Sequence, residues 1–535
     1  MPLEGDLEAV HNWSNPACFV SERGRWMLSG RIMNNPLRLA VFSLLPVVSS
    51  LPAATHYVSL GSTSPMPPYT SWVTAASTIQ DAVDAAAGGD VVVVTNGVYA
   101  VGGREAFNWY GDSMGLNRVA ITNALALRSE NGPLLTVIDG AGAYRCVSLT
   151  AGASLTGFTL TNGVDTHYGM GGAGVWCAST NAFLTNCMLA GNSSRGPFAA
   201  GGGAYGGTLY NCTLAGNSAT NGGFGGGADS CALYNCMLIG NSCYYGGGAY
   251  SSTLYNCTLA GNSGNWGGGA YECTLYNCTL TGNSGPLCYG GGAAGSTLYN
   301  CTLAGNSAYY GGGAYGSIVH NCIIYFNADT NGANFDLTST LSYCCTTPHP
   351  AGSGNITNTP LFIDYASGNL RLQSNSPCIN AGNNALVNTA TDLDGRARVV
   401  SGRVDMGAYE FQPGLSGAFL GWLQRYGLPT DGSADYADSD HDGMNNWLEW
   451  ACGTDPTNPL SVLRLLPPAI TSTTTTVTWQ SVAGVNYSLG RSSNLTSSFT
   501  VLATHIVGQA GATSYIDTNA AGARAFFYRV GVSPP

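Results

Sequence analysis

Residues 246–263 read GGGAYSSTLYNCTLAGNS, and close variants of this string precede and follow them along the chain. A Gly-Asn pair recurs at Asn192, Asn217, Asn241, Asn262, Asn283 and Asn306. An Asn-Cys pair marks the register of each copy, and its cysteines are separated by 25, 24, 21, 21, 23 and 21 residues. Self-similarity at a period of this length indicates a stacked repeat protein. The cysteines of the Asn-Cys pairs are Cys187, Cys212, Cys236, Cys257, Cys278, Cys301 and Cys322.

A period of about 22 residues is typical of leucine-rich repeats or of a β-helix, and the repeat's composition separates the two. Leucine-rich repeats need several leucines and a helical stretch in each unit, whereas this unit has two apolar anchors and a run of glycines. Glycine triplets are unfavourable in helices. Leu254 and Leu259 flank Asn256 as two short strands would flank a bend. The sequence therefore predicts an all-β fold, a right-handed parallel β-helix whose coils bury their apolar side only by stacking.

Stacking places equivalent residues about 4.8 Å apart, so each repeated position becomes a ladder. The asparagines of the Asn-Cys pairs are predicted to form a ladder in which side-chain amides bond from coil to coil. Asparagine also tolerates the left-handed backbone of a tight bend. The members are Asn186, Asn211, Asn235, Asn256, Asn277, Asn300 and Asn321.

The chain contains 18 cysteines, which in a secreted protein suggests a disulfide framework. The ladder cysteines, however, occupy one equivalent position in each coil and are expected to point the same way into the core. We expect most of them to be free and to act as small hydrophobic side chains, with pairing inside the ladder as the alternative. Cys344 and Cys345 are adjacent and fall outside this pattern.

Residues 1–54 are predicted to be a leader with a signal peptide, because Arg38 precedes an apolar run over 39–48 that small residues follow. Residues 1–32 lie ahead of Met33, which is an alternative start. The apolar run is too short to span a bilayer, and no later segment is expected to do so. Helical spacing over 77–87 predicts a helix that covers the first coil. The β-helix is expected over 55–411, with its most regular repeats over about 176–330, and one of its early strands near 120–127.

Three strings follow the repeats: SPCINAG at 376–382, DGRAR at 394–398 and DMGAYE at 405–410. Together they resemble the C-terminal end of bacterial surface β-helix proteins of the choice-of-anchor type, often described as pectate-lyase-like. The glycine-rich repeats are also similar to those of polymorphic outer-membrane proteins and adhesins. The resemblance covers roughly residues 55–411 and implies a secreted or outer cell-surface location.

Residues 412–460 combine a predicted helix near 419–426 with the string DSDHDGMNNWLE at 438–449. This string matches the twelve-residue EF-hand calcium loop at each diagnostic position. The sequence therefore predicts a Ca²⁺ site in a linker between domains. GTDP at 453–456 also resembles the ends of thrombospondin-type-3-like and dockerin-like calcium modules. The predicted ligands are the side chains of Asp438, Asp440, Asp442, Asn446 and Glu449 and the backbone carbonyl of Met444.

Residues 461–535 carry short alternating strand patterns separated by turn signals. This spacing predicts a small β-sandwich. The segment resembles the fibronectin-III-like modules that end many secreted bacterial proteins.

The chain is acidic, with a formal net charge of -11 and no lysine, so a nucleic-acid partner is not expected. Between residues 187 and 327 the charged side chains are isolated: Arg195, Asp229 and Glu272. Asp165 and His167 are the best catalytic candidates, with a structural turn as the alternative. The charged residues of the C-terminal strings are predicted to form structural ion pairs, namely Asp392, Asp394, Arg396, Arg398 and Asp405.

Tyrosines alternate with the inward leucines and are predicted to point outward, where they either stabilise the coils by stacking or bind a glycan. The candidates for this face are Tyr210, Tyr234, Tyr255, Tyr276 and Tyr299. The sequence does not fix the direction of a second row, which consists of Tyr205, Tyr250, Tyr271 and Tyr315.

Three hypotheses of function follow. The first is a non-catalytic surface scaffold or adhesin-like protein. The second is a polysaccharide lyase or glycoside hydrolase of the pectate-lyase-like fold. The third is a non-catalytic protein that binds a polysaccharide or a cell-surface glycan. The fold alone does not choose among them.

Overall fold

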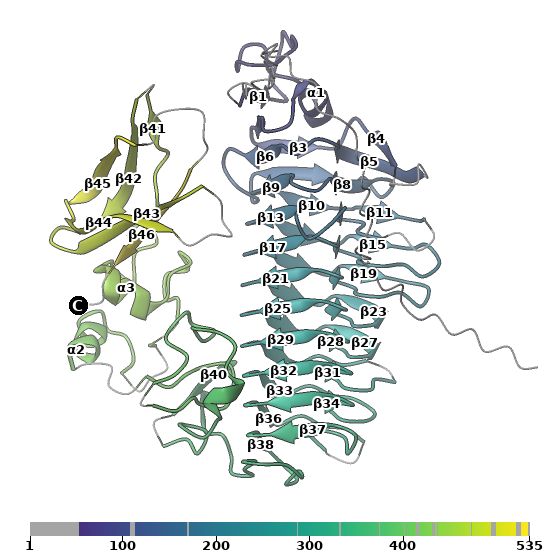
Figure 1. The fold of residues 1–535 in the computed structure, drawn as a ribbon, viewed down its shortest axis with the longest axis vertical. Coiled ribbons are helices and arrows are strands. Elements are labelled where there is room, and N and C mark those ends of the chain that lie inside the picture. The colour runs from purple at the N-terminus through teal and green to yellow at the C-terminus, as the bar shows by residue number, and fades with distance from the viewer. Residues whose placement is uncertain are drawn as a thin grey trace, which may run out of the picture. The chain divides into compact units, whose positions relative to one another are not determined.

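The computed structural model describes residues 53–532, with gaps at 108–112, 168–170, 286, 331–332, 374, 401, 413–416, 431–433, 436, 472, 494–498 and 520–525. The predicted signal peptide therefore lies almost wholly outside the described residues. From residue 55 onward, strands stack in parallel sheets along one axis (Figure 1). The parallel β-helix predicted from the sequence is confirmed.

Two long parallel sheets carry the apolar anchors of every coil. We call the first sheet A, and its strands are β1 (Thr55–Val58), β2 (Val91–Val94), β6 (Ala126–Ser129), β9 (Ser154–Thr156), β13 (Phe183–Thr185), β17 (Thr208–Tyr210), β21 (Ala232–Tyr234), β25 (Thr253–Tyr255), β29 (Thr274–Tyr276), β32 (Thr297–Tyr299), β35 (Ile318–His320) and β37 (Thr340–Ser342). We call the second sheet B, and its strands are β3 (Gly97–Tyr99), β7 (Thr136–Asp139), β10 (Thr159–Thr161), β14 (Met188–Ala190), β18 (Thr213–Ala215), β22 (Met237–Ile239), β26 (Thr258–Ala260), β30 (Thr279–Thr281), β33 (Thr302–Ala304), β36 (Ile323–Tyr325) and β38 (Cys345–Thr346).

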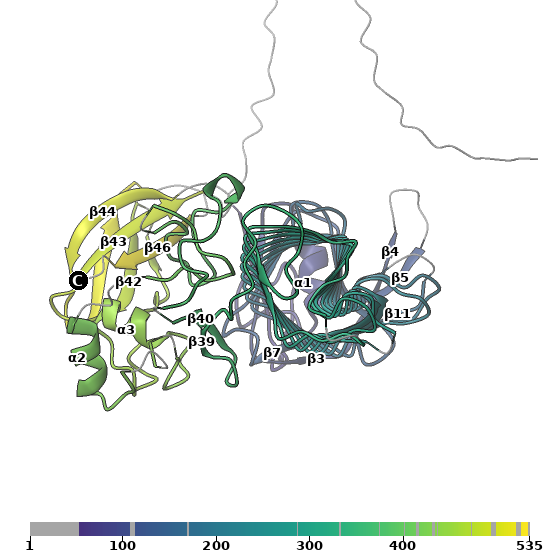
Figure 2. The ribbon, with the colours of Figure 1, turned by 90° about the horizontal axis from the view of Figure 1, so that it is seen from below.

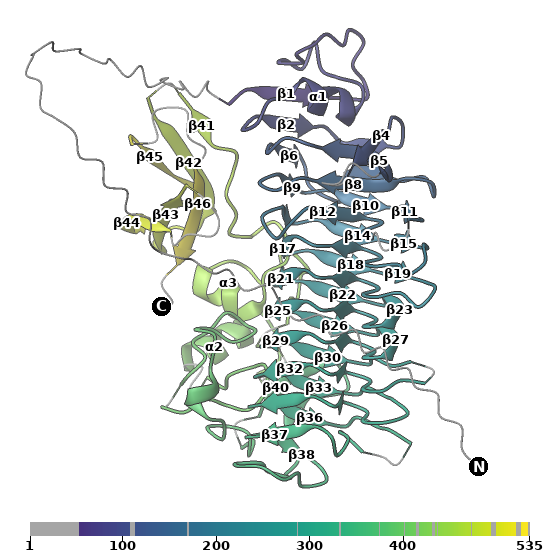
Figure 3. The same cartoon turned by 45° about the vertical axis from the view of Figure 1, so that its right-hand side comes forward.

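Two further sheets complete the coils, and the coils superpose when the stack is seen from below (Figure 2). Sheet C contains β4 (Arg104–Phe107), β5 (Ser113–Ile121), β8 (Arg145–Leu149), β12 (Val175–Cys177), β16 (Ala204–Tyr205), β20 (Ala228–Asp229), β24 (Ala249–Tyr250), β28 (Ala270–Tyr271), β31 (Ala293–Ala294) and β34 (Ala314–Tyr315), with β4 and β5 antiparallel. Sheet D contains β11 (Val164–Asp165), β15 (Ser193–Ser194), β19 (Ser218–Ala219), β23 (Ser242–Tyr245) and β27 (Ser263–Trp266) (Figure 3).

The N-terminal end of the stack is covered by helix α1 (Ile79–Ala85). The Thr78 hydroxyl caps it by accepting the Asp81 N–H at 3.2 Å. Ile79 and Val83 join the buried core that continues to Cys344. The strand predicted over 120–127 is wrong in extent, because β5 ends at Ile121 and β6 begins at Ala126, where the coil turns from sheet C into sheet A.

The asparagines of the Asn-Cys pairs adopt the left-handed backbone that the sequence predicts for a bend. Asn211, for example, has φ 52°. Their coil-to-coil amide bonds are fewer than predicted. Asn235 donates to Asn211 at 3.3 Å and Asn277 donates to Asn256 at 3.0 Å, whereas Asn321 bonds to the backbone of Asn383.

The continuous amide ladder is formed instead by the asparagines of the Gly-Asn pairs, which we call the interior ladder. Asn217 shows the pattern: it is fully buried, and its Oδ1 accepts the backbone N–H and the amide of Asn192 at 3.0 and 2.9 Å. Its Nδ2 donates to the Leu189 carbonyl and to Asn241 Oδ1. The same bonds link Asn192, Asn217, Asn241, Asn262, Asn283, Asn306 and Asn327.

The cysteines of the Asn-Cys pairs are buried in the core as free thiols. Cys257 is typical: its thiol donates to the Tyr255 carbonyl at 3.2 Å and accepts the Cys236 N–H at 3.4 Å. Each thiol thus bonds the backbone of its own coil and of the preceding coil.

Cys344 follows the left-handed residue Tyr343, with φ 54°, as the other ladder cysteines follow their asparagines, and Cys345 begins β38. Cys344 points into the β-helix core and donates to the Val319 carbonyl at 3.4 Å. Cys345 belongs to a separate outer cluster with Cys378 and Met406.

The segment after the last coil contains the hairpin β39 (Phe362–Asp364) and β40 (Asn369–Leu372) and the short helix η1 (Asn384–Leu386). It returns along the bends between sheets A and B. Asn277 Nδ2 donates to the Thr389 hydroxyl at 2.8 Å, and the Ala408 N–H donates to the Thr302 hydroxyl at 3.0 Å. This end segment covers the outer side of the last coils.

Helices α2 (Gly417–Arg425) and α3 (Asn446–Cys452) follow and share an apolar cluster around Phe419 and Leu423. Two small antiparallel sheets complete the described chain, and they share a core around Trp479, Tyr487 and Leu489. Their strands are β41 (Ala469–Ile470), β42 (Thr475–Ser481) and β45 (Gly511–Asp517) in one sheet, and β43 (Asn486–Ser492), β44 (Thr500–Val507) and β46 (Phe527–Val532) in the other.

Candidate functional site

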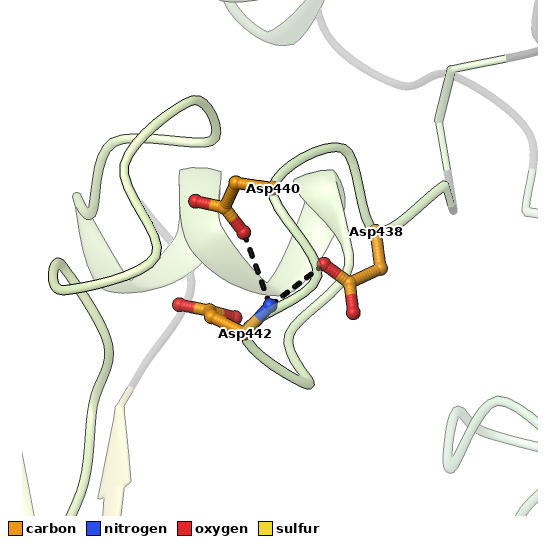
Figure 4. A group of neighbouring side chains, drawn as sticks. All are labelled: Asp438, Asp440 and Asp442. Atoms are coloured by element: carbon orange, nitrogen blue, oxygen red, sulfur yellow. Dashed lines mark hydrogen bonds between the residues drawn. The ribbon is translucent and has the colours of Figure 1, made fainter.

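The loop before α3 brings three carboxylates together (Figure 4). One oxygen from each of Asp438, Asp440 and Asp442 lies within 4.8 Å of the others. Backbone N–H groups hold the loop closed, because the Asp442 N–H donates to Asp438 and Asp440 at 3.2 and 3.3 Å. Gly443, with φ 95°, provides the sharp turn. Three like charges this close repel one another unless a cation or protons neutralise them.

The remaining predicted ligands lie at the start of α3. Glu449 is fully buried, and burial together with the Asp440 and Asp442 charges raises its pKa to about 8. Asn446 is also buried and uses its Nδ2 to donate to the Ala434 carbonyl, which leaves Oδ1 available. Met444 lies in the loop, where its N–H donates to Asp442 at 2.8 Å.

Whether this donor set suits a cation depends on whether its oxygens already accept hydrogen bonds from the protein. Asp440 Oδ2, Asp442 Oδ2, Asn446 Oδ1 and Glu449 Oε2 are all buried without a hydrogen-bond partner. Buried acceptors normally find partners. An oxygen-only set with several unsatisfied members fits a hard divalent cation such as Ca²⁺.

The weak catalytic candidates Asp165 and His167 are in contact, with His167 Nδ1 3.1 Å from Asp165 Oδ1. The same oxygen accepts a bond from Arg145 at 2.9 Å, and both of these side chains are almost fully buried. Arg145 also donates to Asn117 Oδ1 at 3.1 Å and to the Gly172 carbonyl at 3.0 Å. The His167 side chain is 39% exposed. Asp165 is thus held in a buried ion pair, with one partly exposed imidazole beside it.

Arg145 was not predicted as part of this cluster. Its burial lowers its pKa, while the Asp165 charge acts in the opposite direction. The sequence signal was the apolar run CVSL at 146–149 directly after Arg145, because a charged residue at the start of a buried strand needs a buried counter-charge.

The five outward tyrosines of sheet A form a continuous face-to-face stack, which we call the outer tyrosine ladder. Ring centroids are 4.9 Å apart for Tyr210–Tyr234 and Tyr234–Tyr255, 4.7 Å for Tyr255–Tyr276 and 5.2 Å for Tyr276–Tyr299. The planes differ by only 3–17°. Each ring therefore covers the faces of its neighbours and leaves its edge and hydroxyl toward solvent.

The charged residues of the C-terminal strings form a buried cluster around Arg398. Its NH2 donates to the carbonyls of Asp405 and Gly407 at 2.9 and 2.7 Å, and its NH1 lies 4.0 Å from Glu410 Oε2. Asp392 accepts three backbone N–H groups. Burial raises the pKa of Asp392 to about 6 and that of Glu410 to about 8. These acids serve as acceptors inside the end segment.

A second ion pair of the same segment is less buried. Arg371 bonds Asp394 with two nitrogens, at 2.8 and 2.6 Å. Arg396 instead lies over the ring of Trp447, 3.8 Å from its centroid. Most of the charged groups in these strings are therefore engaged by other parts of the fold.

No protein-family model matches the sequence, and no curated protein matches it either. Among solved structures, the chain is similar to pectate lyase Pel9A, at 14% identity and a TM-score of 0.40 over 68% of this chain and 97% of that one. It is similar to a rhamnogalacturonan lyase at 11% identity and a TM-score of 0.32, over 65% of this chain and 90% of that one. A third is the tailspike protein gp49 from Acinetobacter baumannii bacteriophage Fri1, a capsular polysaccharide depolymerase, at 9% identity and a TM-score of 0.26 over 90% and 84% of the two chains. Similarity at such low sequence identity shows a shared fold and says nothing about activity.

Among the described residues, no helix combines the length and the apolar character needed to cross a bilayer.

Proposed function

We propose that the protein is a secreted or cell-surface scaffold, adhesin-like in kind, whose β-helix presents a binding surface and performs no catalysis. The supporting observation is that the acids grouped in and after the coils are engaged inside the fold. Asp165 is paired with Arg145, and Asp229 is buried and accepts the Ser230 hydroxyl at 2.7 Å. A carboxylate held in this way is poorly placed to protonate or attack a substrate.

A polysaccharide-cleaving enzyme is the second candidate, and one contact favours it. His167 combines a bond to Asp165 with a partly exposed ring, which is the arrangement of an oriented imidazole base. His167 lies on the turn that follows β11.

A turnover screen separates the two candidates. We expect the purified full chain to release no new chain ends from polygalacturonate, from sulfated polysaccharide or from neutral polysaccharide. His167→Ala is the diagnostic variant, and His505→Ala, at an exposed position in β44, is the matched control. Turnover that His167→Ala abolishes and His505→Ala preserves would overturn the scaffold proposal.

We also propose that the loop at 438–449 binds Ca²⁺ and thereby orders the junction around α3. The four unsatisfied buried oxygens support this proposal. Extracellular calcium modules bind with dissociation constants on the order of 10⁻⁴–10⁻³ M. Bound Ca²⁺ would supply positive charge between carboxylates that otherwise repel one another.

Calcium addition is expected to raise the melting temperature of the C-terminal region. At a free concentration about a hundred times the dissociation constant, the stabilisation is about 2.7 kcal/mol. Glu449→Gln should remove most of this shift and most of the binding heat in calorimetry. Asp455→Asn changes the same charge outside the donor set and should keep both. Equal binding by the Glu449→Gln variant would contradict the assigned ligands.

A further inference from the structure

Two rows of aromatic side chains flank the glycine-rich turn that leads into sheet C. The first row precedes the glycines, and its members pair as parallel bridges from coil to coil. The second row follows the glycines on the outward positions of sheet C. We call the two rows together the aromatic face. The first row is Phe224, Tyr245, Trp266, Tyr289 and Tyr310, and the second is Tyr205, Tyr250, Tyr271 and Tyr315.

The rings of this face are arranged differently from those of the outer tyrosine ladder. First-row rings stack in pairs, as in Trp266–Tyr289 at 4.4 Å and 15°. Some second-row rings are tilted against the first row: Tyr315 lies at 80° to Trp266 and at 70° to Tyr289, and Tyr271 lies at 51° to Trp266 but stacks on Tyr245 at 29°. Because the rings around Trp266 are tilted against it, its faces are not both covered by stacked neighbours.

The aromatic face is partly exposed, and a carboxylate lies at its border. Tyr310 is 40% exposed, and Tyr250, Tyr271 and Trp266 are partly exposed. Glu272 is exposed beside the second row, where burial and then this carboxylate raise the pKa of Tyr250 to about 12. An acidic border disfavours polyanions.

We infer that the aromatic face binds a neutral polysaccharide chain that runs along the axis of the coils. Sugar rings have apolar C–H faces that pack on aromatic rings, and their hydroxyls bond phenols and carboxylates such as Tyr250 and Glu272. The first row repeats about every 4.8 Å along the axis, close to the length of one pyranose unit in an extended chain, whereas Asp229 and Ala294 interrupt the second row. The inference deepens the proposed scaffold function by naming its surface and its ligand class.

The outer tyrosine ladder, which the sequence made the leading candidate, is less suited to this role. Its inner members are stacked on both faces, as Tyr255 is by Tyr234 and Tyr276, so a sugar would meet ring edges. Trp266 instead stacks on Tyr289 and is tilted against Tyr271 and Tyr315, at 51° and 80°. The outer tyrosine ladder provides a matched control within one coil, since Tyr255 and Trp266 belong to the same repeat.

Affinity electrophoresis of the full chain tests the inference, with soluble xyloglucan and glucomannan as neutral probes and polygalacturonate as the anionic probe. We expect retardation by at least one neutral probe and none by polygalacturonate. Trp266→Ala should weaken the binding by about tenfold, the size of one lost aromatic contact. Trp266→Phe should restore most of it, and Tyr255→Ala should leave it unchanged. Melting temperatures establish that each variant is folded.

Three results would overturn the inference: no retardation by either neutral probe, stronger retardation by polygalacturonate, or equal losses in Trp266→Ala and Tyr255→Ala. Cleavage of a probe is a separate outcome, because it would refute the scaffold proposal while leaving binding at the aromatic face in place. Absence of both binding and cleavage would refute this inference alone.

Discussion

Replacing Asn217 by alanine is expected to lower the free energy of unfolding by about 3–5 kcal/mol, because a buried polar group left without its partner costs about 1–3 kcal/mol. Alanine removes the acceptor of the Asn192 N–H and of the Asn192 amide, and the donor to the Leu189 carbonyl. All of these groups lie in the interior, and Asn217 itself is fully buried. Urea unfolding followed by far-ultraviolet circular dichroism measures the loss.

The matched control is Asn211→Gly in the same coil. Asn211 is exposed and has φ 52°, a conformation that glycine adopts without strain. The Asn211→Gly replacement should therefore lower the free energy of unfolding by less than about 1 kcal/mol. Equal losses in the two variants would show that the interior ladder contributes no more than the bends do.

For these two asparagines, the sequence predicts the backbone bend but not which amide points into the core. Both recur once per coil, and asparagine's tolerance of the left-handed region correctly predicts the bend at Asn211. Which of the two amides points inward depends on how the coil turns, between sheets A and B at Asn211 and between sheets B and D at Asn217. Those turns are properties of the closed coil and not of the local string, so the sequence did not identify the asparagines of the continuous interior ladder.

The approach of the three carboxylates at 438–442 could be predicted from the sequence because these residues are local. Asp438, Asp440 and Asp442 lie at alternate positions of one short loop, so local spacing determines their approach. The aromatic face could not be predicted in this way. Trp266 and Tyr271 are separated by three glycines and an alanine, and the angle between their rings depends on how that turn closes against the coils above and below.

Arg145 and Asp165 show the same limit at longer range. They are 20 residues apart in the chain and meet only because β11 follows β8 within one coil of the stack. The repeat period predicts that coils exist. It does not predict which acid lies next to a buried arginine in the irregular early coils. To the catalytic hypothesis about Asp165 the structure adds a buried ion pair with Arg145.

Replacing Arg398 by methionine is expected to destabilise the end segment by about 3–5 kcal/mol, the cost of removing one partner from a buried charge cluster. Methionine fills similar space but supplies no charge to the buried Glu410 and no donor to the carbonyls of Asp405 and Gly407. Because the end segment covers the bends near Thr302, its loosening should expose residues 377–411 to protease. Limited proteolysis with mass mapping of the cleavage sites measures this effect.

The stability that the Arg398→Met variant loses should also depend on pH, and the loss should increase as the pH rises. Burial raises the pKa of Glu410 to about 8, so below that value the carboxyl can be protonated and needs no counter-charge. Above it, Glu410 is ionised, and the folded state of the variant holds an uncompensated charge that the unfolded state does not. The variant should therefore lose more stability above about pH 8 than well below it. Arg371→Met is the control: its pair with Asp394 is partly exposed, so its loss should be about 1 kcal/mol. A larger deficit for Arg371→Met than for Arg398→Met would mean that the less buried pair, and not the Arg398 cluster, holds the end segment on the coils.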